Sequence, residues 1–180
     1  DHLIKDLYNA IIKAVDQTQR DLLVFLPGVR EISRVAELLQ RQSCSFDVLS
    51  LHGSMNLAEQ KQVLSKTNKQ RVILSTNVAE SSITLDGVDT VIDSGLAKIS
   101  RFDQRTGFGR LELSRISLAS ATQRAGRAAR QFSGRCIRLW SRQDELSMAK
   151  MDIPEVQRAD LAESLLFLAR IGNTNFREFS

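Results

Sequence analysis

Two hydrophobic patterns alternate along the first half of the chain. Leucine, isoleucine and valine recur every four residues over 3–19, which predicts one apolar stripe of a helix. A continuous apolar run over 21–26 ends at Pro27 and Gly28, and such a run is typical of a strand buried on both faces. The same alternation predicts further helices over 32–39 and 57–64, and further strands over 46–51, 72–74 and 90–92.

Regular alternation of strands and helices indicates an α/β fold. We expect a parallel sheet of five or six strands with helices on its faces. After Lys98, two strand-like segments flank residues 103–107, which predicts an inserted antiparallel β-hairpin. An alanine- and arginine-rich helix over 120–130 and a last strand over 136–140 then complete a domain of residues 1–150.

Residues 151–180 differ in pattern from what precedes them. Pro154 lies in a linker-like turn, and Asp160 is placed to cap a helix that carries Leu161, Leu165 and Leu168. We expect this segment to be the truncated start of a second, helical domain, of the winged-helix kind.

Basic residues are concentrated in one part of the chain. The net charge is +4, but residues 98–142 hold eleven Lys or Arg and two acids, which leaves the remainder at −5. Ten of the eleven are arginine, whose planar fork suits phosphate. A polyanion such as a nucleic acid is one partner that fits this region, and a solvated face with scattered arginines is the alternative.

Overall composition is that of an ordinary globular protein, with 42% hydrophobic and 26% charged residues. Cys44 and Cys136 lie in apolar segments without metal-ligand spacing, so we expect buried thiols in a reducing compartment and no metal site. No stretch is long enough to cross a membrane. We therefore expect a cytoplasmic protein with no membrane partner.

The sharpest motif is residues 123–130, which read Gln-Arg-Ala-Gly-Arg-Ala-Ala-Arg. On a helix, Gln123, Arg127 and Arg130 would project from one face and Arg124 from another. Two converging guanidinium groups repel each other unless an anion lies between them, and a nucleoside triphosphate is such an anion. Spacing alone also permits an arginine-rich surface helix.

The motif resembles motif VI of superfamily 2 helicases. Other stretches resemble motifs of the same family in the same order, and several ordered motifs are far more specific than one. These stretches are 23–28 (motif IV), 51–55 (the following strand end), 75–84 (motif V of the DEAH branch) and 91–98 (a strand of that branch). Residues 102–107, 115–117 and 158–161 are most similar to the bacterial HrpB-type proteins.

The resemblance implies a RecA-like fold and a set of site residues. Gln123, Arg127 and Arg130 would face the γ-phosphate of ATP, with the arginines as fingers. Thr84, Asp86 and Gly126 would lie on the nucleotide side, with Asp86 near a ribose hydroxyl. Asp86-Gly87 is also a common turn pair, so plain turn chemistry is the alternative for both Thr84 and Asp86.

Contacts with nucleic acid are implied at four positions: Gly28, Asn77, Ser81 and Arg105. Each has a plainer alternative, which is a strand-ending turn for Gly28, helix capping for Asn77 and Ser81, and a hairpin packed on a neighbouring domain for Arg105. The resemblance implies single-stranded RNA, or DNA, as the bound strand. Ala129 replaces a glycine usual in motif VI, and we expect activity to survive this change.

Two parts of an ATPase are missing from the sequence. There is no GxxxxGK[ST] loop and no Asp-Glu-x-His strand end, which hold phosphates and Mg²⁺ in P-loop enzymes. The resemblance places both in an N-terminal RecA-like domain, with ATP in the cleft between the domains. The chain is then expected to be inactive alone. A non-catalytic RecA-like module that binds nucleic acid or protein is the alternative.

Overall fold

The computed structural model describes residues 2–41, 45–65, 67–81, 83–103, 105–106, 108–128, 130, 133–154 and 162–170. The chain divides into two units. One consists of residues 1–98 and 113–152, and the other includes residues 99–112 and residues after 152. Each is described separately below.

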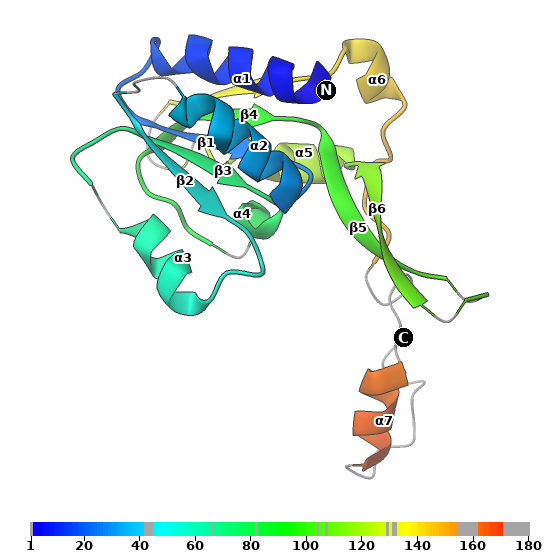
Figure 1. The fold of residues 1–180 in the computed structure, drawn as a ribbon. Coiled ribbons are helices and arrows are strands. Elements are labelled where there is room, and N and C mark those ends of the chain that lie inside the picture. Colours follow the sequence, from blue (N-terminus) through cyan, green and yellow to red (C-terminus); the bar gives the residue numbers. More distant parts are fainter. Residues whose placement is uncertain are drawn as a thin grey trace. The chain divides into compact units, whose positions relative to one another are not determined.

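A five-stranded parallel sheet forms the centre of the larger unit (Figure 1). The order is β2-β3-β1-β4-β7, and every neighbouring pair is parallel. This confirms the predicted α/β class, and each predicted apolar run forms a strand. The strands are β1 (Asp21–Phe25), β2 (Asp47–Leu51), β3 (Arg71–Ser75), β4 (Val88–Asp93) and β7 (Arg135–Arg138).

The central strands explain the continuous apolar runs. Every residue of β1 and β3 is buried, and Leu23 lies between Ile73 on one side and Val91 on the other. Successive side chains of a strand point to opposite faces, so a strand covered on both faces needs apolar residues throughout.

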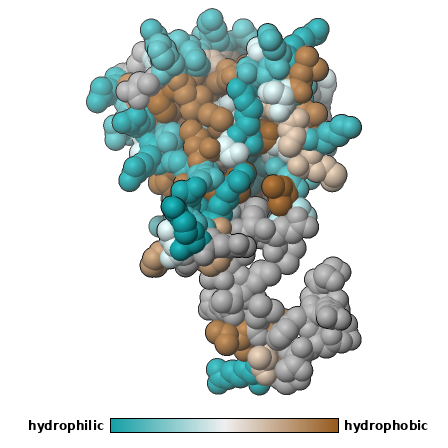
Figure 2. All heavy atoms as spheres, turned by 90° about the vertical axis from the view of Figure 1, so that its right-hand side faces the viewer, coloured by the Kyte–Doolittle hydropathy of each residue, from teal (hydrophilic) through white to brown (hydrophobic). Residues whose placement is uncertain are grey.

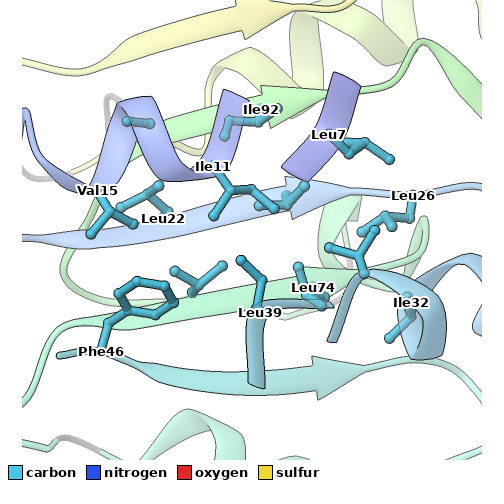
Figure 3. Close-up of a cluster of buried hydrophobic side chains, with 14 residues drawn as sticks. Leu7, Ile11, Val15, Leu22, Leu26, Ile32, Leu39, Phe46, Leu74 and Ile92 are labelled. Carbon is cyan, nitrogen blue, oxygen red and sulfur yellow. The ribbon is translucent and has the colours of Figure 1, made fainter. Parts of the chain in front are cut away.

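Helices α1 (His2–Val15) and α2 (Val29–Gln40) cover one face of the sheet (Figure 1). Leu7 and Ile11 of α1 and Leu39 of α2 pack against apolar residues of the strands (Figure 3). The helical stripe predicted over 3–19 ends at Val15.

The opposite face carries a second apolar cluster. Val63 of α3 (Leu57–Leu64) and Ala79 of α4 (Val78–Ser81) pack there with Phe25 and Ile73. Helix α5 (Leu118–Ala125) adjoins α4 and β4. The short helices α4 and α6 (Arg142–Leu146) were not predicted from the sequence.

Helix α5 is shorter than the sequence predicted. It ends at Ala125, and Gly126 forms its C-cap, so the expected helix over 120–130 is wrong beyond Ala125. The amide of Arg127 binds the carbonyl of Arg124, as in a tight turn. Ala128, which follows this turn, is buried in the second cluster.

Strands β5 (Leu96–Asp103) and β6 (Phe108–Arg115) form a separate two-stranded sheet, which confirms the inserted hairpin. Within it, Glu112 pairs with both Arg101 and Arg110. Helix α7 spans Ala162–Arg170. Among the helices that the structure describes, none has the length and apolarity to cross a membrane.

Some large hydrophobic side chains remain at the surface of the larger unit. Leu57, Leu146 and Met151 are exposed. Figure 2 shows one face of the molecule, on which hydrophobic side chains gather between hydrophilic ones.

Candidate functional site

Loops at the carboxyl ends of the parallel strands meet at one edge of the sheet. The amide of Leu26 binds the carbonyl of Ser75 at 2.8 Å, and the amide of Ser94 binds the carbonyl of Phe25 at 3.2 Å. Gly28 and Asn77 follow directly on these strand ends. In parallel α/β proteins this edge is where ligands bind.

Arg124 lies beneath this edge, in the interior. Its side chain is 1% exposed. Nε donates to Glu80 Oε2 at 3.0 Å, Nη1 donates to Asp93 Oδ1 at 2.9 Å, and the guanidinium lies 4.8 Å from the centre of the Phe25 ring. Arg124 therefore joins α5 to α4, to the end of β4 and to β1. The sequence had placed it correctly on a different side of the helix from Gln123, which is exposed.

Asp93 is a fully buried carboxyl group. Oδ1 accepts hydrogen bonds from Arg124 and from the amide of Gly95, at 2.9 Å each, whereas Oδ2 has no partner among the residues described. Burial raises the pKa of Asp93 because a charged carboxylate loses its hydration, and Arg124 opposes that rise.

Arg127 is also buried, at 6% exposure. Nε and Nη2 donate to the carbonyl of Glu80, the first at 2.9 Å, and Nη1 donates to the carbonyl of Ile83 at 2.8 Å. These carbonyls lie at the carboxyl end of α4, where helical carbonyl groups lack partners within the helix. Burial lowers the pKa of Arg127, the nearby charge of Arg130 lowers it further, and Glu80 partly offsets both.

Arg130 is exposed and lies beside the same segment. Its Nη1 donates to the Thr84 hydroxyl at 3.2 Å. Arg127 and Arg130 therefore both reach residues 80–84, although they do not share a helical face. Gln123 and Gly126 are exposed, and a methyl group at Gly126 would make only ordinary contacts. Ala129 lies outside the described residues.

Asp86 lies near the opposite edge of the sheet, directly before β4. Its carbonyl accepts a hydrogen bond from Arg71 Nη2 at 3.1 Å, and its side chain is exposed. Gly87 has φ +88, a left-handed conformation that favours glycine. The structure thus contains the Asp86-Gly87 turn, which was the alternative expected from the sequence, and it separates Asp86 from Gly28 and Asn77.

Asn77 directly precedes the short helix α4, and Ser81 is its last residue. Both are exposed, and the carbonyl of Asn77 accepts the amide of Glu80 at 2.9 Å. Both side chains therefore belong to the surface at the carboxyl edge of the sheet, while the Glu80 side chain between them turns inward to Arg124.

Gly28 is buried at the start of α2, beneath the side chain of Lys98. A Cβ atom at Gly28 would lie 2.8 Å from Lys98 Nζ, which itself forms an ion pair with Glu31 at 2.8 Å. The Lys98 side chain therefore occupies the space that a side chain at position 28 would need. No sequence motif predicted a separate role for Lys98.

Arg105 belongs to the hairpin unit. Its side chain is exposed, and its amide binds Asp103 Oδ1 at 2.9 Å.

The acidic partners Glu80 and Asp93 are the other residues that sequence reasoning missed. For Asp93, the signal in the sequence was an acidic residue at the end of the apolar run Val91-Ile92. The described residues contain no group of three or more His, Cys, Asp or Glu that could hold a metal.

Comparisons with known proteins identify the family of the chain. The chain matches the helicase conserved C-terminal domain family over residues 3–132. It is 39% identical over 173 residues to the ATP-dependent RNA helicase HrpA of Escherichia coli (strain K12), covering 93% of this chain and 13% of that protein. It is 38% identical over 167 residues to HrpB of the same organism, covering 91% of this chain and 20% of that protein.

A solved structure gives the same result. The crystal structure of the E. coli DExH-box NTPase HrpB superposes with a TM-score of 0.81 at 34% identity, covering 97% of this chain and 22% of that one. The chain thus spans about a fifth or less of these HrpA and HrpB proteins. The family match agrees with the parallel RecA-like sheet and with the motif VI arginines beside motif V. The chain therefore belongs to the helicase conserved C-terminal domain family, among the DEAH-type helicases.

Proposed function

We propose that this chain is the second motor domain of an ATP-dependent RNA helicase, and that it supplies arginine fingers to an ATP site shared with a preceding RecA-like domain. One observation carries the proposal. Arg127 and Arg130 both bond the short segment at the end of α4, Arg127 at the carbonyls of Glu80 and Ile83 and Arg130 at the Thr84 hydroxyl, so two positive charges are held beside one another. Such a pair favours binding of a polyanion such as a triphosphate.

The two arginines would act differently. Arg130 is exposed, so its guanidinium is free to reach a phosphate after only a side-chain rotation away from Thr84. Arg127 already donates to two carbonyl groups, so it would reach the phosphate through its remaining N–H groups. Gln123 and Thr84 would complete this wall of the site. Mg²⁺ would be held by the preceding domain, which also supplies the phosphate loop.

The nucleic-acid track would run over the carboxyl edge of the sheet, past Asn77, Ser81 and the Gly28–Lys98 pair. Exposed polar groups and an ammonium suit a sugar-phosphate backbone and predict little sequence preference. RNA as the substrate rests on the names of the relatives. Arg105 on the hairpin would guide the strand, and residues 151–180 would begin a further, helical domain.

The test replaces Arg130 or Arg127 by alanine in the intact helicase. Arginine fingers stabilise the charge that develops during phosphoryl transfer, so we expect RNA-stimulated ATP turnover to fall by roughly 10³-fold for Arg130→Ala. RNA affinity, measured by fluorescence anisotropy without nucleotide, should change little. Arg127→Ala should lower turnover and also loosen the end of α4.

Arg142→Ala is the matched control, since Arg142 is an exposed arginine of α6, outside motif VI. It should leave turnover unchanged. If Arg130→Ala turns over ATP as fast as the control, the finger role is wrong. If the intact protein shows no RNA-stimulated turnover at all, the non-catalytic binding module becomes the better description.

A further inference from the structure

Arg124 differs from Arg130 of the same motif, because its side chain is buried. Its charge is balanced by two acids from elements distant in sequence, Glu80 on α4 and Asp93 at the end of β4. Nη1 also lies 3.4 Å from the carbonyl of Leu96. One side chain thus fixes the relative positions of α5, α4 and the β4–β5 turn.

Stability alone is a weak reason for such a network. A buried ion pair gains little over well-packed apolar residues, because both charges lose their hydration. This network is also incomplete, since Asp93 Oδ2 has no partner among the described residues. What a guanidinium supplies, and an apolar side chain does not, is a planar fork that holds two acceptors at fixed directions.

Glu80 connects this fork to the candidate fingers. Its carboxylate binds Arg124, and its carbonyl binds Arg127. Glu80 also lies on the four-residue helix that follows Asn77 and ends at Ser81. Any shift of α4 caused by a strand bound at Asn77 and Ser81 must therefore move the carbonyl that holds Arg127.

We propose that Arg124 is a positioning residue that couples RNA bound at α4 to the arginines at the ATP site, by locking Glu80 to α5 and β4. This inference rests on the proposed function. Without the lock, α4 is no longer fixed to α5 and β4, so a strand bound at α4 would not set the position of the Glu80 carbonyl, and hence of Arg127, relative to the rest of the site. RNA would still bind and ATP would still be hydrolysed, but the two would be less strongly linked.

The experiment measures basal and RNA-saturated ATP turnover of the intact helicase, and takes their ratio as the stimulation factor. Arg124→Lys keeps the charge but cannot reach both acids as a fork, and Glu80→Gln keeps the shape but removes one ion pair. We expect each to lower the stimulation factor about three- to tenfold, the range typical of coupling networks. The double variant should lose no more than the worse single variant, because both substitutions break one link.

Leu39→Ala is the control for a purely structural effect. Leu39 is fully buried in the cluster on the opposite face of the sheet, so its truncation destabilises the fold without touching the network. It should lower basal and stimulated turnover together and leave their ratio unchanged. If Arg124→Lys fails to fold, Glu80→Gln carries the test by itself.

The two proposals fail in different ways. If RNA stimulates the parent protein and the variants have the same stimulation factor, the coupling role is wrong and the helicase function still holds. Strictly additive losses in the double variant would likewise overturn the shared link. A parent protein with no RNA-stimulated turnover would remove both proposals.

Discussion

At the scale of single residues, burial decides reactivity as well as packing. Cys136 on β7 lies beside Asp93, and burial together with that negative charge raises the pKa of its thiol to about 11, although Arg138 opposes the rise. The thiolate is the reactive form of cysteine, so Cys136 should be almost inert near neutral pH.

We therefore expect iodoacetamide to label Cys136 slowly at pH 8, with a rate that rises about tenfold per pH unit towards pH 10. The measurement is mass spectrometry of a Cys44→Ser variant, which leaves one thiol. Because the folded pKa is the raised one, unfolding in urea should accelerate labelling at pH 8. A folded-state rate that levels off below pH 9 would show that the thiol is less buried than the structure has it.

Residue roles were the hardest property to predict from sequence. The shared face of Gln123, Arg127 and Arg130 assumed a helix that in fact ends at Ala125. Local periodicity describes residues within a few turns of each other. The burial of Arg124 instead depends on Glu80 and Asp93, which lie 44 and 31 residues away in sequence. No local pattern contains that information.

At the scale of elements, prediction succeeded wherever an apolar pattern was long enough to be distinctive. The five strands and the hairpin formed as expected, because parallel strands buried on both faces leave continuous apolar runs. Helices α4 and α6 were missed because four or five residues complete barely one helical turn, and no apolar stripe can develop.

Helix α3 illustrates how a weakly packed element depends on its end. Only Val63 of its eight residues is buried, and its first turn is held by a capping box in which Asn56 Oδ1 accepts the amide of Glu59 at 2.9 Å. Asn56→Ala should lower the free energy of unfolding by about 1 kcal/mol, measured by urea denaturation. Lys61→Ala on the exposed side of the same helix should have almost no effect. Equal effects would mean that the cap contributes nothing here.

At the scale of the whole molecule, one ion pair ties separate segments together. Arg71 Nε donates to Asp21 Oδ2 at 2.9 Å, and its other N–H groups reach carbonyls at the end of α3 and in the turn before β4. This pair is nearly buried, whereas Lys69 and Asp47 form a solvent-exposed pair close by, at 2.7 Å.

The two pairs should differ sharply in their effect on stability. Arg71→Met leaves Asp21 buried without its partner, so the free energy of unfolding should fall by about 3 to 5 kcal/mol. Lys69→Met removes a screened surface charge and should cost less than about 1 kcal/mol. Urea denaturation of both variants measures the difference, and similar losses would contradict the structural assignment of burial.

The position of β1 in the middle of the sheet has a consequence for synthesis. Both neighbours of β1 come later in the chain, and Asp21 precedes its partner Arg71 by fifty residues. At about 5 to 20 residues per second, a ribosome needs roughly 3 to 10 seconds to make that stretch. During this interval β1, the most hydrophobic strand of the domain, has no strand to pair with. The nascent chain is therefore most exposed to chaperone binding and to aggregation before β3 and β4 have been made.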